Sequence, residues 1–250
     1  MKIRALLAFT LCGALASFSA SAADLLVSAA SSLSSVGTAL AVQYQNDHPS
    51  TKVLMSFAAS DAVLQQIQNG APSDIFASAD PAAMDRAVAS KAVDPASRRD
   101  FAGNDVVMVV PIDNPAKVMG LADLRGAQVK RIALGNPAWV PAGRYSQASL
   151  QASGDWDVVH GKAVLSQNVR QALDYVARGE VEAGFVFATD AATMHDKVKV
   201  VGTLPTPEPV RYSIALVQRQ GRSPDAQGFL DFVISPQGQA ILAKYGFKAL

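Results

Sequence analysis

The stretch DLLVSAASSL, residues 24–33, joins a short apolar run to two serines, Ser31 and Ser32. Residues 24–29 have the length and composition of a buried strand, and apolar residues from Leu33 to Tyr44 then recur at helical spacing. This stretch therefore predicts a strand that leads through a pair of serines into a helix.

The same unit occurs twice more in the sequence. Residues 53–57 predict a second strand, and Ser60 with the following Asp61 predicts the start of a helix. Residues 75–77 predict a third strand, after which Asp80 is placed to cap a helix that begins with a proline. Three successive strand-helix units predict a parallel sheet with helices on both faces, the α/β class.

A second series of strands and helices follows the polar stretch 94–105. We predict strands at 106–111, 131–134, 183–187, 198–202 and 212–217, and helices at 142–152, 169–177, 226–234 and 237–245. Irregular stretches at 102–105 and 205–210 bracket the central block. The pattern predicts two lobes, residues 23–103 with 210–250 and residues 104–209, which two crossing segments connect.

Residues 1–22 have the pattern of a secretory signal peptide. Lys2 and Arg4 precede an apolar run at 5–16, and the segment ends in the small residues Ala20, Ser21 and Ala22. The apolar run is shorter than the ~20 residues that a membrane-spanning helix needs. We therefore expect a cleaved leader and a soluble product outside the cytoplasm.

The charge balance excludes partners that are held by bulk charge. The chain has 22 basic and 21 acidic residues, and without the predicted leader it would have 20 and 21. A nearly neutral protein is not suited to nucleic acid or to an anionic membrane surface. The single cysteine, Cys12, lies in the predicted leader after Leu11, so we expect no disulfide, no cysteine metal ligand and no lipid anchor.

The sequence carries none of the common catalytic motifs. G-x-S-x-G, H-E-x-x-H, G-x-G-x-x-G and G-x-x-x-x-G-K are all absent. The three histidines, His48, His160 and His195, lie in polar segments and are expected at the surface. A secreted hydrolase stays open as an alternative, but it would need one of them beside a serine and a carboxylate.

Uncharged donors follow several of the predicted strands. Ser32 and Ser60 stand where helices begin, and helix N-termini bind anions through free N–H groups without any cation. Serine is also a preferred N-cap, so both could serve only their own helices. The segments NPAWVPAG (136–143) and QNV (167–169) lead into helices in the same way, and ordinary loops with caps are the alternative there too.

Several of these segments together resemble a known family. In order and spacing, they are similar to the periplasmic molybdate-binding proteins of ABC importers, the ModA family, from about Val27 to Phe247. The matching segments are SAASSL (28–33), SFAAS (56–60), GAPSDIFASAD (70–80), GNP (135–137), VPAG (140–143), NVR (168–170), SPQ (235–237) and KYGF (244–247).

The resemblance implies a two-lobed periplasmic binding protein of type II. Each lobe would be a mixed, mostly parallel sheet flanked by helices, with the ligand in the cleft between the lobes. Such a protein binds molybdate or tungstate and delivers it to the ABC permease in the inner membrane. The resemblance also implies a monomer without enzymatic activity or cofactor, in which molybdenum is present only as the bound oxyanion and has no direct protein ligand.

The family's ligand set can be carried over by position. It implies hydroxyl and backbone N–H donors from Ser32 and Ser60 in the first lobe, and backbone N–H donors from Ala142 and Val169 in the second. Such neutral donors suit a buried dianion, because hydrogen bonds to an ionised acceptor are roughly twice as strong as neutral ones.

One position departs from the family. Related proteins often add a tyrosine hydroxyl where this chain has Phe187, so either the affinity is lower or a nearby donor such as Thr189 compensates. Another small oxyanion such as sulfate or a phosphonate stays open as the ligand, since cavity size and not donor type would separate sulfate from molybdate.

Overall fold

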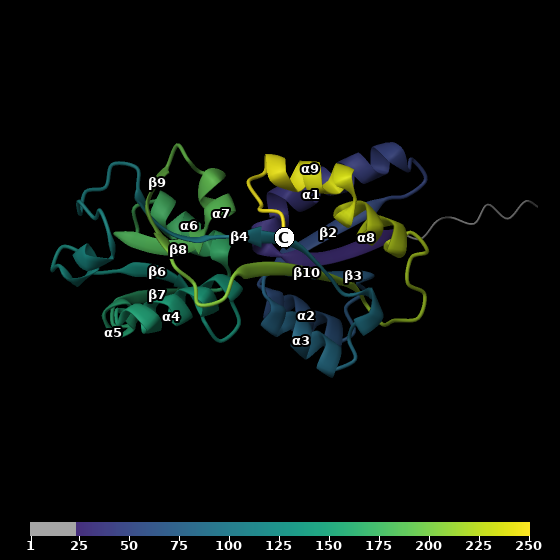
Figure 1. Ribbon diagram of the computed structural model, residues 1–250, viewed down its shortest axis with the longest axis horizontal. Helices are drawn as coiled ribbons and strands as arrows, with labels where there is room; N and C mark the ends of the chain where they lie inside the picture. Colours follow the sequence, from purple (N-terminus) through teal and green to yellow (C-terminus); the bar gives the residue numbers. More distant parts are fainter. Residues whose placement is uncertain (1–23) are drawn as a thin grey trace, which may run out of the picture.

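The computed structural model describes residues 24–250 and divides them between two lobes that lie side by side, each built on one five-stranded sheet (Figure 1). The predicted signal peptide, residues 1–22, lies outside the described residues. The predicted α/β class and the two-lobed architecture are confirmed.

The sheet of the first lobe has the strand order β2-β1-β3-β10-β4. β1 pairs in parallel with β2 and β3, and β10 pairs antiparallel with both β3 and β4. β10 therefore runs against the other four strands. The bounds are β1 Leu25–Ala30, β2 Val53–Ala58, β3 Ile75–Ser78, β4 Arg99–Asn104 and β10 Val210–Leu216.

The sheet of the second lobe repeats this plan with the order β7-β6-β8-β5-β9. β6 is parallel to β7 and β8, and β5 is antiparallel to β8 and β9. Here too a single strand, β5, runs against the other four. The bounds are β5 Val106–Pro111, β6 Ile132–Gly135, β7 Ala163–Ser166, β8 Ala183–Phe187 and β9 Val198–Leu204.

Helices cover both faces of each sheet (Figure 1). In the first lobe, α1 (Ser34–Asp47), α8 (Ala226–Ile234) and α9 (Pro236–Lys244) pack together on one face, while α2 (Ser60–Gln68) and α3 (Pro81–Ala89) pack together on the other. In the second lobe the corresponding pairs are α4 (Pro141–Ser153) with α5 (Trp156–His160) and α6 (Val169–Ala177) with α7 (Ala188–Ala192). Short 3-10 turns are η1 (Ser31–Leu33), η2 (Pro95–Ser97) and η3 (Leu121–Arg125).

Local sequence signals explain where several helices begin. The Asp80 carboxylate accepts a hydrogen bond of 3.0 Å from the N–H of Ala83, and Pro81 is the first residue of α3, as predicted. Asn168 caps α6 in the same way, because its side chain accepts from the N–H of Gln171.

The polar stretch 94–105, whose end at 102–105 we expected to be irregular, contains the strand β4. β4 begins with the exposed Arg99 and Asp100, but Phe101 and Ala102 are buried, and its outer edge pairs with the C-terminal segment through Gly103 and Lys248. Contacts with a segment about 145 residues away define this strand, so local alternation did not reveal it. The short elements β7, α5 and α7 were also not predicted from the sequence.

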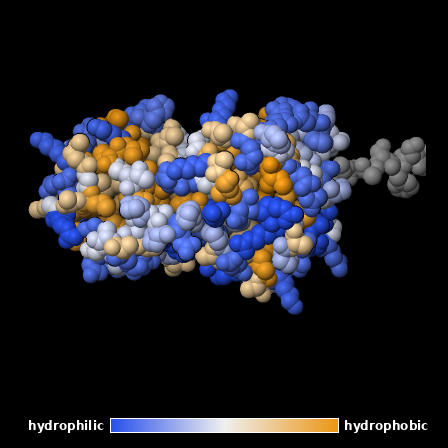
Figure 2. All heavy atoms as spheres, viewed as in Figure 1, coloured by the Kyte–Doolittle hydropathy of each residue, from blue (hydrophilic) through white to orange (hydrophobic). Residues whose placement is uncertain are grey.

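The chain crosses between the lobes twice, from β4 to β5 and from β9 to β10. Of the boundaries proposed from the sequence, 103/104 falls before the last residue of β4 and 209/210 falls directly before β10, and both stay predictions. None of the helices in residues 24–250 is both long and apolar enough to cross a membrane. On the face shown in Figure 2, hydrophilic side chains predominate and hydrophobic residues appear in separate groups.

Candidate functional site

The four residues proposed to bind the ligand all lie at the beginnings of helical segments. Ser32 is in η1, Ser60 is the first residue of α2, Ala142 is the second residue of α4, and Val169 is the first residue of α6. Their exposed fractions are 2%, 0%, 1% and 3%. The first-turn N–H groups of a helix lack partners within that helix and carry a partial positive charge, so four such starts offer donors to an anion.

The two serines are not helix caps. The N-cap of α2 is Ala59 and that of η1 is Ala30, and neither helix start has a side-chain cap. The Ser60 hydroxyl instead accepts a hydrogen bond of 3.0 Å from the N–H of Ala79, beyond the end of β3. The alternative interpretation, that these serines serve only their own helices, is therefore wrong.

Both hydroxyls keep a proton to donate. The Ser32 Oγ accepts a hydrogen bond of 3.0 Å from the hydroxyl of Tyr212, as the Ser60 Oγ does from Ala79. Among residues 24–250, neither serine donates to a protein acceptor. A buried donor without an acceptor is costly, so each hydroxyl is suited to a ligand that accepts hydrogen bonds.

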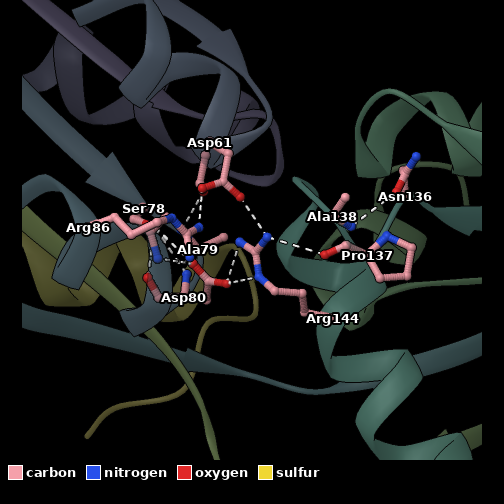
Figure 3. A network of polar contacts seen from close by, with 11 residues as sticks. Asp61, Ser78, Ala79, Asp80, Arg86, Asn136, Pro137, Ala138 and Arg144 are labelled. Carbon is pink, nitrogen blue, oxygen red and sulfur yellow. Dashed lines mark hydrogen bonds and ion pairs between the residues drawn. The ribbon is translucent and has the colours of Figure 1, made fainter. Parts of the chain in front are cut away.

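An ionic cluster joins the first lobe to the start of α4 (Figure 3). The Arg144 guanidinium contacts Asp61 and Asp80 of the first lobe, with nitrogen-oxygen distances of 2.6 Å in both pairs. Asp61 directly follows Ser60, and Arg144 lies two residues after Ala142. The cluster therefore holds the helix starts that carry Ser60 and Ala142 against each other.

A second contact joins the lobes at the start of α6. Arg170 donates from Nη2 to the hydroxyl of Ser35 at 3.3 Å, and α6 packs against η1. Arg170 directly follows Val169, and Ser35 lies three residues after Ser32. Of the contacts between the lobes, these two bring the proposed residues together in pairs, Ser60 with Ala142 and Ser32 with Val169.

Arg170 is also paired within its own lobe. Its Nε lies 2.6 Å from the carboxylate of Asp190, which is fully buried. Burial raises the pKa of Asp190 from 3.8 to about 6, and the nearby Arg170 only partly opposes this shift. The charge of Arg170 is therefore directed at a protein carboxyl and not at the proposed ligand position.

The loop before α4 has a fixed shape. A Cβ atom on Gly143 would lie 1.9 Å from the carbonyl oxygen of Gly135, so only glycine allows this close approach. The Asn136 side chain accepts from the N–H of Ala138 at 3.0 Å, and its carbonyl accepts from the N–H of Val140 at 2.8 Å. These contacts hold the first turn of α4 at the end of β6.

Phe187 lies at the end of β8 and is buried between two tyrosine rings. Its ring centroid is 5.7 Å from that of Tyr212 and 6.3 Å from that of Tyr145. Thr189, the other residue considered at this position, is buried and accepts a hydrogen bond of 2.9 Å from Asn104. Their roles toward a ligand stay predictions.

A groove of about 550 Å³ lies between the lobes next to these residues. Its walls come from α2 on one side and from the loops before α4 and α6 on the other, and they include Ala59, Asp61, Ala138, Trp139, Gln167 and Asn168. The groove therefore reaches the direct neighbours of Ser60 and Val169, while the four proposed residues themselves are covered.

The histidines offer no catalytic base. His48 stacks on Tyr44 at 4.2 Å, His160 lies 5.0 Å from the Trp156 ring, and the Nδ1 of His195 contacts a main-chain carbonyl. All three are exposed. The hydrolase alternative therefore loses its candidates, and within residues 24–250 no three His, Cys, Asp or Glu residues are grouped to hold a metal ion.

Comparison with known proteins identifies the family of this chain. The family model described as bacterial extracellular solute-binding protein matches residues 25–248. The chain belongs to this family of solute-binding proteins. Its fold has two lobes with a groove between them.

This solute-binding protein is similar to several molybdate-binding proteins. It is 37% identical to the molybdate-binding protein ModA of Escherichia coli (strain K12) over 88% of this chain and 87% of the relative. It is 31% identical to ModA of Haemophilus influenzae (strain ATCC 51907 / DSM 11121 / KW20 / Rd), with 93% and 92% covered. The solved periplasmic molybdate-binding protein of Azotobacter vinelandii has the same fold, with a TM-score of 0.78, 24% identity, and 90% and 99% covered.

Several residues that join the lobes of this solute-binding protein were not predicted from the sequence. Arg144, Asp61 and Tyr212 were not considered as part of the site, although Tyr212 contacts Ser32 directly. Arg144 stands directly after the segment VPAG and is charged within the first turn of a helix, which is a weak signal. No local signal marked Tyr212, because a tyrosine in a buried strand usually serves packing.

Proposed function

We propose that this protein binds molybdate outside the cytoplasm and delivers it to the membrane permease of an ABC importer. The molybdate-binding relatives at 37% and 31% identity support the ligand, and the family supports the role of a solute-binding protein. We extend the proposal to tungstate, which has the same charge and tetrahedral shape.

The observation that carries the proposal is the pair of buried serine hydroxyls that accept from the protein and do not donate to any described residue. With the first-turn N–H groups of Ala142 and Val169, they form a set of donors only. A fully ionised oxyanion offers only acceptors, so it satisfies such a set, and a ligand with its own buried donor would not.

The charge of the ligand is met by dipoles and not by cations. Arg144 is held by Asp61 and Asp80, and Arg170 is held by Asp190, so the neighbouring guanidinium groups already have anionic partners. Helix N-termini and hydroxyl groups supply the favourable field locally, although the chain is nearly neutral.

The remaining features of the proposal follow from this mode of binding. Ser32, Ser60, Ala142 and Val169 would contact the oxygens, and molybdenum would have no protein ligand. We propose a periplasmic monomer that lacks enzymatic activity, a cofactor, a lipid anchor and affinity for nucleic acid, and whose lobes close on the anion. Its partner would be the permease in the inner membrane.

The test is calorimetric titration of residues 23–250, freed of bound anions, with molybdate, tungstate and sulfate in parallel. We expect saturable binding of molybdate and tungstate, and a ligand at about 1,000 times its Kd should stabilise the fold by about 4 kcal/mol. Binding of sulfate without molybdate would show that the oxyanion is wrongly assigned. If none of the three anions gives binding heat or a shift in melting temperature, the proposed function is rejected.

A further inference from the structure

A buried chain of side-chain hydrogen bonds leads to Ser32. Asn104 Nδ2 donates to the hydroxyl of Tyr212 at 3.2 Å, and Tyr212 donates to the Oγ of Ser32 at 3.0 Å. Asn104 Nδ2 also donates to the hydroxyl of Thr189 at 2.9 Å. This series of hydrogen bonds thus starts at the end of β4, continues through a residue of β10 and ends at a residue proposed to bind the anion.

Asn104, the first residue of this series, fixes the direction of its hydrogen bonds. The main-chain N–H of Asp105 donates to Asn104 Oδ1 at 2.9 Å, which sets the amide so that its nitrogen faces Tyr212 and Thr189. The Tyr212 oxygen accepts one amide proton, so its own single proton is free to go to Ser32. The Ser32 oxygen is then occupied as an acceptor, and its proton must point elsewhere.

The chain is shielded from water. Tyr212 is fully buried, and Asn104, Thr189 and Ser32 are buried as well. Burial raises the pKa of the Tyr212 hydroxyl well above its ordinary value, so the group stays neutral and keeps its proton. Hydrogen bonds in series polarise one another, most strongly where the dielectric constant is low.

The neighbouring Phe187 ring offers the Tyr212 hydroxyl no second hydrogen-bond acceptor. The Phe187 ring packs 5.7 Å from the Tyr212 ring and has no polar group. Within the described residues, the hydroxyl of Tyr212 has hydrogen bonds only with Asn104 and Ser32. Its proton therefore has one acceptor.

We propose that Tyr212 is a positioning residue for oxyanion binding, which holds the Ser32 hydroxyl as a donor toward the ligand. This inference rests on the proposed function only in that the ligand is an oxyanion. Tyr212 acts through Ser32 and needs no contact with the anion. Asn104 is the fixed donor that keeps Tyr212 pointing in this direction.

The first test is the affinity of Tyr212→Phe, which removes one oxygen and keeps the ring. We expect a loss of about tenfold in molybdate affinity, the effect of one hydrogen bond that supports a charge-assisted contact. Tyr145→Phe is the matched control, because its hydroxyl accepts from the N–H of Arg211 at 3.3 Å and its ring also neighbours Phe187. The control should bind within about threefold of the parent.

A double-mutant cycle separates positioning from a general structural effect. In a Ser32→Ala background the Tyr212 proton has lost its target, so Tyr212→Phe should cause little further loss of affinity. An equal loss in both backgrounds would reduce Tyr212 to a structural role and overturn the inference. If Tyr212→Phe does not fold, Asn104→Ala tests the same chain from its other end with the same expected cycle.

The outcomes distinguish the two proposals. If the parent binds molybdate and Tyr212→Phe binds it equally well, the inference is wrong and the proposed function stands. If the parent binds only sulfate, the molybdate proposal is wrong, and the cycle is measured with sulfate. If the parent binds none of molybdate, tungstate and sulfate, both proposals are rejected.

Discussion

Ser60 combines two roles in one hydroxyl group. Its oxygen accepts from Ala79, which ties α2 to the end of β3, and its proton is available to a ligand. A change at Ser60 should affect binding more than stability. The hydrogen bond from the N–H of Ala79 is only one of many in the first lobe.

We predict that Ser60→Ala lowers molybdate affinity by about ten- to a hundredfold, the value of a hydrogen bond to a charged group, ~1.5–3 kcal/mol. Isothermal titration would measure the loss, with thermal unfolding to verify the fold. Ser56→Ala is the control, because Ser56 is exposed and pairs only with Ser28 in the neighbouring strand. Parent-like affinity in Ser60→Ala would show that the site is misplaced.

Phe187→Tyr should add a donor where the family often has one. The ring already lies between Tyr145 and Tyr212, so a hydroxyl needs no new packing partner. We expect tighter molybdate binding, by up to the ~1.5–3 kcal/mol of one hydrogen bond to a charge. Titration of this variant beside the parent measures the change, and an unchanged or weaker affinity would contradict the assigned position of Phe187.

Asp190 should make the stability of the fold depend on pH. Its pKa is about 6 in the folded protein against 3.8 in a model compound, so the folded state binds the proton more tightly. The contribution of Asp190 to the free energy of unfolding is fully present below about pH 4. It falls by roughly 1–3 kcal/mol as the pH rises through about 6.

Urea unfolding of the parent and of Asp190→Asn from pH 4 to pH 7 measures this effect. The free energy of unfolding of the parent should fall relative to the variant across that interval. Asp157→Asn, at an exposed carboxyl, is the control. A difference between parent and Asp190→Asn that is constant with pH would contradict the prediction.

At the scale of elements, the sequence was informative where the signal was local. The strands at 53–58 and 75–78 and the helix beginning at Pro81 follow apolar runs and a cap that can be recognised without neighbours. β4 was missed because its partners are β10 and the C-terminal segment, far away in the sequence. The sequence placed a serine cap at the start of α2, whereas the N-cap is Ala59 and the Ser60 hydroxyl accepts from Ala79, directly after β3.

The first turn of α4 should depend on a single glycine. We predict that Gly143→Ala lowers the free energy of unfolding by about 1–3 kcal/mol, because the new methyl group would overlap the carbonyl of Gly135 and displace the helix start. Molybdate affinity should fall as well, since Ala142 moves with it. Chemical unfolding and titration measure the two effects.

Gly120→Ala is the matched control for this change. No heavy atom lies within 4 Å of a Cβ at Gly120, and its backbone is extended, so alanine fits there without strain. Equal stability of Gly143→Ala and Gly120→Ala would show that the approach of α4 to β6 is not required.

At the scale of the whole molecule, the lobes are held by charges far apart in the sequence. Arg144 contacts residues 64 and 83 positions earlier, and Arg170 reaches a serine 135 positions earlier. Periodicity and motifs identify helix starts within one lobe, but they contain no information about which starts will face each other. The proposed donors could thus be named from the family resemblance, whereas the contacts that bring them together could not.

We predict that Arg144→Gln favours the separated lobes. Asp80 would be left buried without its cation, which opposes closure and should speed molybdate release by about tenfold. Stopped-flow kinetics measures release, and small-angle scattering of the anion-free protein should show a larger radius of gyration. Arg125→Gln is the control, because Arg125 is exposed and pairs with Asp155 inside one lobe. Unchanged release and radius would show that the cluster does not hold the lobes together.

The position of β10 has a consequence for the order in which the molecule can form. β10 lies between β3 and β4 in the first sheet, yet it follows every strand of the second sheet in the chain. When the chain is synthesised from its N-terminus, all strands of the second sheet are present before the first sheet can receive β10, its fifth strand. The first lobe is thus the last to be completed, because its sheet lacks a strand until residue 216 has been synthesised.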